Sequence, residues 1–159
     1  MFPTEETLAV VKEKYGIKDL SVIEGKRIVI LDDTVINGAT ARVIAQLFRN
    51  AGAGEIFFLT PMPKFVDGCD MGFIIIRGRL IALEKSNGGY RIRTNEEIAK
   101  EIGADYFGCT SLEAVKAAFE GITGKKDAAC LNCIGGGHPL QRNVKEIIFD
   151  AEMFEVKHL

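Results

Sequence analysis

The chain has 159 residues, of which 47% are hydrophobic and 26% are charged. This composition is typical of a globular domain and excludes an intrinsically disordered chain. The 20 basic and 22 acidic side chains leave a net charge of -2, which excludes a broad electrostatic attraction to nucleic acid or to an anionic membrane.

The start of the chain, Met1 to Glu6, lacks the basic and then apolar pattern of a secretory signal, and no apolar run approaches the roughly 18 residues of a membrane span. We therefore expect a cytoplasmic protein without membrane contact. In a reducing compartment, the four cysteines favour metal binding or burial over disulfides. No linker or repeat divides residues 1–159, so we expect one domain.

A first helix is predicted between Thr4, a suitable N-cap, and Gly16. A strand follows at residues 28–32, then a helix that ends at Gly52, then a second strand at 56–59. These elements predict a βαβ unit with a right-handed crossover, and hence an α/β fold with a parallel sheet and flanking helices. The continuous apolar run of the first strand is typical of a strand that is covered on both faces.

Pro61 and Pro63 end the second strand, because proline cannot donate to a sheet, and a loop that carries Cys69 follows. Residues 73–93 allow two interpretations. Asn87–Gly88 is typical of a hairpin turn, whereas residues 80–86 fit a short helix equally well.

Two capping boxes then predict two helices. Thr94 pairs with Glu97 in the first, which ends at Gly103, and Thr110 pairs with Glu113 in the second, which ends at Gly121. Residues 121–159 are a cysteine- and glycine-rich loop and a tail, in which residues 144–156 fit either a helix or a strand.

The first strand runs directly into Asp32 and Asp33 and then into a loop that begins the next helix. Open α/β sheets bind ligands at this end of their strands. Successive backbone N–H groups in residues 34–39 can form a nest for a phosphate. Two acids would repel a bare phosphate, so they suit ribose hydroxyls or a Mg²⁺ ion. An acid pair by itself fits a solvated turn equally well.

Together these residues resemble the phosphoribosyl pyrophosphate (PRPP) motif of type I phosphoribosyltransferases. The resemblance implies that Asp32 and Asp33 contact the ribose hydroxyls. It also implies that the following loop wraps the 5-phosphate; this loop comprises Thr34, Val35, Ile36, Asn37, Gly38, Ala39 and Thr40.

Cys130 and Cys133 are separated by two residues, a spacing that lets both thiolates face one metal, as in zinc and iron–sulfur sites. The pair alone is half a site, and unligated or redox-active thiols have the same spacing. Cys69 follows the second strand, so the fold can bring it near this pair, although spacing alone does not require it.

Most of residues 20–139 also resemble the C-terminal part of glutamine PRPP amidotransferases, a family that begins purine synthesis. The matching segments are Glu24–Arg27, the PRPP motif, Asn50–Ala53, Glu97–Asp105 and Cys130–Cys133 with His138–Pro139. The resemblance implies PRPP as ligand and Mg²⁺ as cofactor. In the cluster-bearing branch it implies a 4Fe–4S cluster at Cys69, Cys130 and Cys133.

The chain also departs from that family. It begins with Met1–Phe2 instead of a catalytic N-terminal cysteine, Asn37 replaces the usual arginine, and residues 84–93 look like an insertion. Cys109 has no counterpart, and is either a small buried side chain or a substitute fourth ligand.

We therefore expect an incomplete phosphoribosyltransferase domain without a glutaminase domain. It would act as a homo-oligomer or with a glutaminase/N-terminal transferase subunit. The alternatives are a non-enzymatic PRPP or nucleotide sensor with a metal centre, and a zinc-stabilised structural domain.

Overall fold

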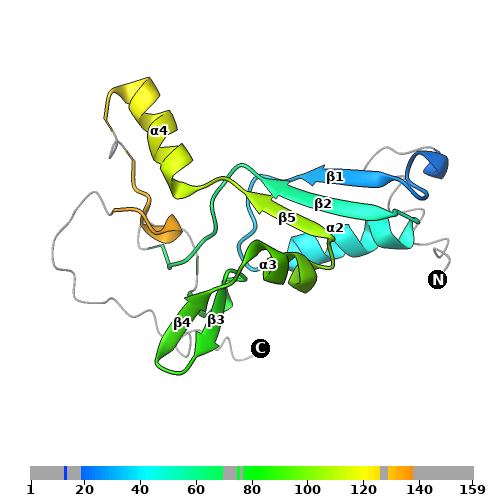
Figure 1. Cartoon of the computed structure of the whole chain (residues 1–159), viewed down its shortest axis with the longest axis horizontal. Helices are drawn as coiled ribbons and strands as arrows, with labels where there is room; N and C mark the ends of the chain where they lie inside the picture. Colours follow the sequence, from blue (N-terminus) through cyan, green and yellow to red (C-terminus); the bar gives the residue numbers. More distant parts are fainter. Residues whose placement is uncertain (1–12, 14–18, 70–74, 76, 126–128, 138–159) are drawn as a thin grey trace, which may run out of the picture.

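Three parallel strands form the central sheet of the protein (Figure 1). They are β1 (Arg27–Leu31), β2 (Glu55–Thr60) and β5 (Tyr106–Cys109), with β2 in the middle. α2 (Ala39–Asn50) connects β1 to β2, and α3 (Asn95–Ile102) precedes β5. The predicted α/β class and the parallel pairing of the first two strands are confirmed.

The computed structural model describes residues 13, 19–69, 75, 77–125 and 129–137. The elements predicted at residues 4–16 and 144–156 lie outside the described residues, apart from Glu13. A short 3-10 helix, η1 (Leu20–Val22), leads into the sheet. No helix in the described ranges is long and apolar enough to cross a membrane.

α2 and α3 both pack on the same face of the sheet, and the main core lies between them and the strands. Side chains alternate between the two faces of a strand, so every second residue of the sheet points toward these helices. The most deeply buried of them are Ile56, Phe58 and Phe107. From the helices, the core receives Ala41, Ile44, Ala45, Phe48, Ile98, Ala99 and Ile102.

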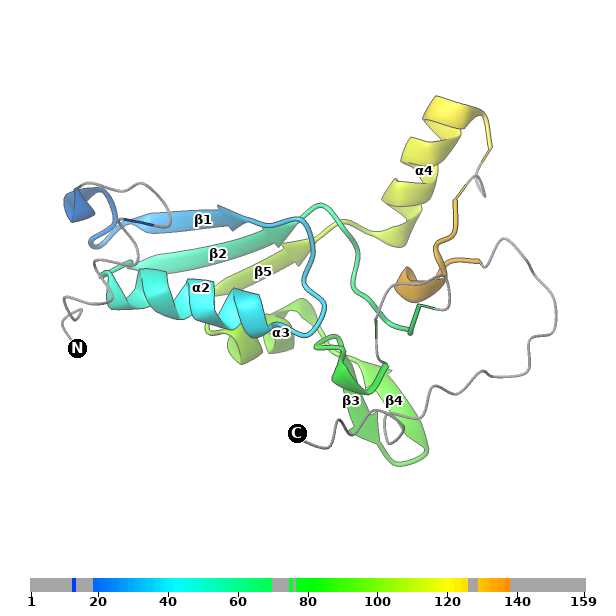
Figure 2. The ribbon, with the colours of Figure 1, turned by 180° about the vertical axis from the view of Figure 1, so that it is seen from behind.

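The opposite face of the sheet is open, which corrects the prediction of a strand covered on both faces. Val29 and Leu31 of β1 are 64% and 75% exposed. Figures 1 and 2 show no described helix above this face. The apolar run predicted burial on both faces, but both connecting helices lie on one side.

The segment between β2 and α3 contains a two-stranded hairpin, which settles the two interpretations of residues 73–93. A 3-10 turn, η2 (Arg77–Arg79), comes first, and β3 (Leu83–Ser86) then pairs with β4 (Gly89–Ile92) in antiparallel register. Asn87–Gly88 is the turn, and Gly88 has a φ of 97° that suits glycine. A helix at residues 80–86 is excluded.

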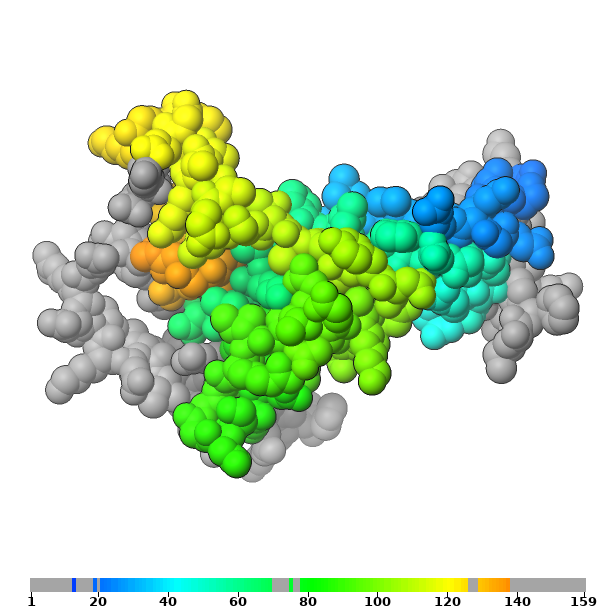
Figure 3. Space-filling view, viewed as in Figure 1, coloured from blue at the N-terminus to red at the C-terminus, as the bar shows by residue number. Residues whose placement is uncertain are grey.

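A second, smaller core lies beyond the carboxyl ends of the strands. It joins α4 (Leu112–Thr123) and the 3-10 turn η3 (Asn132–Ile134) to the loop after β2. Its buried members are Phe65, Leu80, Leu83, Leu131 and Ile134. In the space-filling view these parts form a lobe beside the strands (Figure 3).

The ends of α4 differ from those predicted. Its N-cap is Ser111, whose side chain accepts a hydrogen bond from the Ala114 N–H at 3.1 Å, and not Thr110. The helix continues through Gly121 to Thr123, with Gly124 as its C-cap at a φ of 72°. The helix thus begins at Leu112, which packs on the second core with Val115 and Phe119.

The start of α3 confirms the predicted capping box and adds an ion pair to it. The Thr94 side chain accepts from the Glu97 N–H at 3.2 Å, and Glu97 accepts from the Thr94 N–H at 2.8 Å. Both guanidinium Nη groups of Arg91 also bind Glu97, at 2.6 and 2.8 Å. The hairpin is thereby tied to the first turn of α3.

We predict that Glu97→Gln destabilises the protein at neutral pH but not in strong acid. Two hydrogen bonds, one from the Arg91 side chain and one from the Thr94 N–H, lower the pKa of Glu97 from 4.5 to about 2. The carboxylate therefore stabilises the fold above pH 4.5, and this contribution disappears as the pH falls from about 4.5 toward about 2. Urea denaturation at several pH values measures the difference.

Glu113→Gln, at an exposed position in the first turn of α4, is the control and should show no such pH-dependent difference. A Glu97→Gln deficit that stayed constant down to pH 2 would contradict the assignment.

Candidate functional site

The two acids lie at the carboxyl end of β1, where the sequence places them. The Asp32 N–H donates to the Leu59 carbonyl at 3.0 Å and so extends the pairing with β2 by one residue. Asp33 comes next and is exposed. The acids therefore lie at the end of the strands where open α/β sheets generally bind ligands.

Thr60, the last residue of β2, holds the backbone of Asp33. Its side chain is buried, and its hydroxyl donates to the Asp33 carbonyl at 2.7 Å and accepts from the Met62 N–H at 3.2 Å. The sequence analysis missed this residue. A polar side chain at the inward-facing end of an otherwise apolar strand was the available signal.

Each acid also uses one carboxylate oxygen within the loop. Oδ1 of Asp32 accepts from the Asp33 N–H at 3.1 Å, and Oδ1 of Asp33 accepts from the Thr34 N–H at 2.7 Å. No donor among the described residues reaches Oδ2 of either acid. These oxygens remain for hydroxyl groups or a cation, because a carboxylate has several acceptor positions.

Backbone donors are available in the loop and at the start of α2. The Asn37 side chain accepts from the Ala39 N–H at 2.9 Å, and the N-cap, Gly38, has no side chain to cap the helix. Within the described part of the chain, the N–H groups of residues 35–38 and of Thr40 have no acceptor. Such groups, with the helix dipole, suit an anion.

The loop is anchored on both cores. Val35 is buried in the main core, and Ile36 packs on the second core. The Ile36 carbonyl accepts a hydrogen bond from the Ile81 N–H at 2.9 Å. Ile81 also fills the space beside Gly38, where a Cβ would overlap its Cδ1 atom. Gly38 is thus required by packing and by its φ of 75°, independently of any ligand.

The nearest basic side chain in sequence is turned to a structural partner. Arg42, in the first turn of α2, donates to the Glu101 carboxylate at 2.6 Å and to the Glu101 carbonyl at 3.1 Å. This pair ties α2 to the end of α3. The other Nη group of Arg42 donates to the Asn37 carbonyl at 3.4 Å, so the guanidinium also contacts the loop.

The loop after β2 lies against the turn that contains Cys130 and Cys133. The Cys133 carbonyl accepts from the N–H groups of Val66 and Asp67, at 2.8 and 3.1 Å, two or three residues before Cys69. The pKa of the Cys133 thiol is raised by burial, and further by the nearby charges of Cys69, Cys130 and Asp67. The fold thus brings the three predicted ligands into one region.

These thiols do not form a finished metal site. Among the described residues, no three His, Cys, Asp or Glu side chains are close enough to hold one ion. Cys109, on β5, is partly buried and packs against the main core, and burial raises its pKa. Lys64 is the charged neighbour that acts on it, and lowers that pKa.

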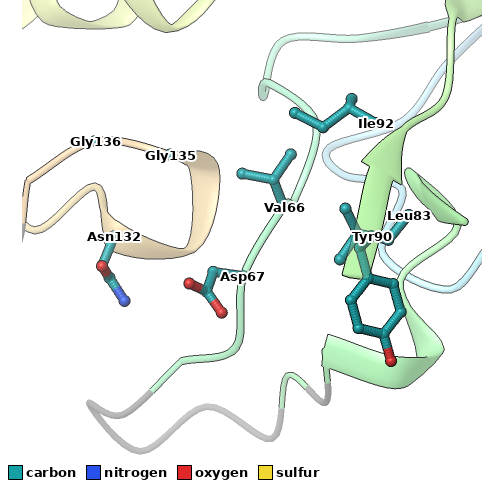
Figure 4. Close-up of a pocket in the computed structure, with 8 residues that line it drawn as sticks. All are labelled: Val66, Asp67, Leu83, Tyr90, Ile92, Asn132, Gly135 and Gly136. Atoms are coloured by element: carbon teal, nitrogen blue, oxygen red, sulfur yellow. The ribbon is translucent and has the colours of Figure 1, made fainter. Parts of the chain in front are cut away.

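A hollow of about 390 Å³ lies next to the cysteine turn (Figure 4). It is bounded by the loop after β2, the β3–β4 hairpin and the η3 turn, and it includes none of residues 32–40. Asp67 and Asn132 face each other at its edge. The lining residues are Val66, Asp67, Leu83, Tyr90, Ile92, Asn132, Gly135 and Gly136.

Similarity searches connect the chain to amidophosphoribosyltransferases. The protein of that name from Methanocaldococcus jannaschii is 38% identical over 129 residues, which cover 80% of this chain and 25% of the relative. The Bacillus subtilis protein is 34% identical over 125 residues, 76% of this chain and 24% of the relative. The chain thus spans about a quarter of the length of these relatives. No family model matches it.

Two solved structures superpose on most of this chain. The glutamine PRPP amidotransferase from B. subtilis, complexed with ADP and GMP, superposes with a TM-score of 0.53 at 29% identity. The match covers 87% of this chain and 29% of that one. A structure described as the allosteric regulatory enzyme of purine biosynthesis gives a TM-score of 0.53 at 27% identity, with the same coverage.

We predict that Gly38→Ala destabilises the protein more than Gly124→Ala. Both glycines have left-handed φ values, of 75° and 72°, but a Cβ at Gly124 meets nothing within 4 Å. Gly124→Ala should therefore cost about 1–2 kcal/mol from conformation alone. Gly38→Ala should cost about 1–3 kcal/mol more, because of the overlap with Ile81. Urea denaturation measures both.

Ile81→Val removes the overlapping Cδ1 atom. Combined with Gly38→Ala, it should recover part of the excess cost, which a double-mutant cycle measures. Equal costs for the two glycine variants, or strict additivity in the cycle, would contradict the assigned contact.

Proposed function

We propose that this protein binds the ribose 5-phosphate end of PRPP at residues 32–40, as part of a cytoplasmic amidophosphoribosyltransferase of purine nucleotide biosynthesis. One observation carries the proposal. Two acids at the end of β1 continue into a loop with available N–H donors that starts α2. The similarity of the chain to an amidophosphoribosyltransferase, which extends over 80% of the chain, supports this proposal.

Each part of the loop would then have a distinct role. The acceptor oxygens of Asp32 and Asp33 would bind the ribose hydroxyls, and the N–H groups of residues 35–38 and of Thr40 would bind the 5-phosphate. The hydroxyls of Thr34 and Thr40 add further donors. Mg²⁺ would neutralise the pyrophosphate, a role that suits a site whose side chains are acidic.

The reaction would be displacement of pyrophosphate by an amine. The bond between the ribose anomeric carbon and the pyrophosphate oxygen breaks, and a carbon–nitrogen bond forms at the same carbon. The contribution of residues 32–40 would be to position the ribose.

A further polypeptide would supply what residues 32–40 do not. The chain corresponds to about a quarter of its relatives, and Arg42, the basic side chain that contacts the loop, is paired with Glu101. We propose that the protein works as a homo-oligomer or with a glutaminase/N-terminal transferase subunit.

The cysteine region is proposed to bind a metal centre. Cys69, Cys130 and Cys133 lie in one neighbourhood, and thiolate ligands suit a 4Fe–4S cluster or zinc. Binding would draw the thiols together and require them to deprotonate, which burial alone disfavours. The role would be structural, because the turn joins η3 to the loop after β2.

We predict that Asp33→Asn weakens PRPP binding in the presence of Mg²⁺ by about tenfold or more, since a charged acceptor is lost. Thr60→Val removes one hydrogen bond to the Asp33 backbone and should weaken binding about two- to tenfold. Isothermal titration calorimetry measures both.

Glu113→Gln, on α4, is the control that should bind as the unmodified protein does. Unchanged affinity in Asp33→Asn would place the ligand elsewhere, with the 390 Å³ hollow as the first alternative.

We predict that the anaerobically purified protein is brown and contains iron, and that Cys130→Ser loses both the colour and the metal. Cys109→Ser should retain them, because Cys109 lies against the main core. Visible spectra and metal analysis give the result. Zinc in place of iron would show that the centre is a zinc site. Colour that survives Cys130→Ser would refute the proposed set of ligands.

A further inference from the structure

One backbone donor of the loop at residues 32–40 is occupied by a side chain of the loop itself. The Asn37 side-chain oxygen, Oδ1, accepts a hydrogen bond from the Ala39 N–H at 2.9 Å. Ala39 is the first residue of α2, so this N–H is the first donor of the helix. Among the described residues, the N–H groups before and after it, those of Gly38 and Thr40, have no acceptor. Asn37 therefore interrupts an otherwise open row of donors.

The oxygen of Asn37 lies where an oxygen of a bound phosphate would have to lie. A phosphate at a helix N-terminus accepts from successive N–H groups, at donor–acceptor distances of about 3 Å. Oδ1 of Asn37 already stands at such a distance from the Ala39 nitrogen. A backbone N–H carries a single hydrogen, so a phosphate oxygen can take this bond fully only if Asn37 gives it up.

The backbone of the loop is held in place, whereas the Asn37 side chain is not. The carbonyls of Ile36, Asn37 and Gly38 all accept hydrogen bonds from the protein. Their donors are the Ile81 N–H at 2.9 Å, Nη1 of Arg42 at 3.4 Å and the Arg42 N–H at 2.9 Å. Asn37 itself is exposed. Its side chain can therefore rotate into solvent while the backbone stays where it is.

A phosphate is the stronger of the two acceptors. Hydrogen bonds to a charged acceptor are roughly twice as strong as those between neutral groups, and the helix dipole favours a negative charge at this end of α2. A bound phosphate would therefore displace the neutral amide. The bond between Asn37 and Ala39 then exists in the empty protein and not in the complex, so it favours the empty protein.

We infer that Asn37 competes with the 5-phosphate for the Ala39 N–H and thereby sets the affinity of the loop for phosphorylated ligands. On binding, the phosphate takes the N–H and the Asn37 side chain turns to solvent. This inference rests on the proposed function, because it takes residues 32–40 as the phosphate site.

Competition of this kind links ligand affinity to the stability of the empty protein. A substitution that removes the internal bond destabilises the empty protein. It leaves the complex unchanged, because the bond is already broken there. The affinity must then rise by the same factor by which the folding equilibrium of the empty protein falls.

The opposite role for Asn37 predicts the opposite result. Its amide also carries two N–H donors on Nδ2. If these donors held the phosphate, loss of the side chain would weaken binding. The direction of the change in affinity therefore separates a competing acceptor from a helping donor.

Asn37→Ala and Ser111→Ala form a matched pair for the test. Both remove a side-chain oxygen that accepts a hydrogen bond at the start of a helix, at 2.9 and 3.1 Å, but Ser111 caps α4 and lies outside the loop. Isothermal titration calorimetry with PRPP and Mg²⁺ measures affinity. Urea denaturation with and without saturating PRPP measures stability.

Asn37→Ala should bind PRPP about two- to tenfold more tightly than the unmodified protein. Its urea midpoint should be lower without ligand and equal to that of the unmodified protein at the same saturating concentration of PRPP. Ser111→Ala should keep its affinity and lose the same stability in both conditions.

Asn37→Asp provides a second variant that keeps the acceptor and adds a negative charge. It should be at least as stable as the unmodified protein when empty, because aspartate is a good cap beside the positive end of a helix. It should bind PRPP about tenfold or more weakly, because its charge opposes the phosphate.

Unchanged or weaker binding by Asn37→Ala would overturn the inference and leave the proposed site in place. A stability loss in Asn37→Ala that persisted at saturating PRPP would overturn it as well. Absence of PRPP binding by the unmodified protein would overturn the proposed function, and the inference with it.

Discussion

The packing of Ile81 against the start of α2 is the contact on which the site depends. Its N–H binds the Ile36 carbonyl, and its side chain occupies the space beside Gly38 that any other residue would fill. Ile36 belongs to the second core and Ile81 to the main core. This one contact therefore links the two cores through the loop and holds the N–H groups near Asp33 in place. A loop fixed in this way loses little entropy on binding a ligand.

Among the described residues, the acids beside the loop have no basic partner, whereas the nearby basic side chains are already paired, and this limits which ligands the loop can bind. Asp32 and Asp33 stand at the end of β1, while Arg42 is paired with Glu101 and Lys64 donates to the Arg93 carbonyl at 2.8 Å. Neutral hydroxyls and cations suit the acids, and an anion suits only the N–H groups further along the loop. A ligand with hydroxyls near one end and a phosphate about one sugar away satisfies both requirements.

The sheet and the site have a common boundary at β1. On one side, β2 supplies Thr60, which holds the Asp33 backbone from a buried position. On the other side, no strand among the described residues pairs with β1. The two acids and this unpaired edge therefore belong to one strand. Anything that orders the edge of β1 would also order the acids that follow it.

The sequence by itself determined the local features: the strand before Asp32 and Asp33, the capping box at Thr94, the hairpin turn at Asn87–Gly88 and the helix that follows Gly38. Each depends on interactions between residues a few positions apart, or on the backbone preference of glycine. The tertiary structure alone decided that Val29 is exposed, that Thr60 and Ile81 hold the loop, and that the Cys69 loop lies on the Cys133 turn. The sequence of an apolar strand is the same whether one face of the strand or both are covered, because burial depends on segments that are distant in the sequence.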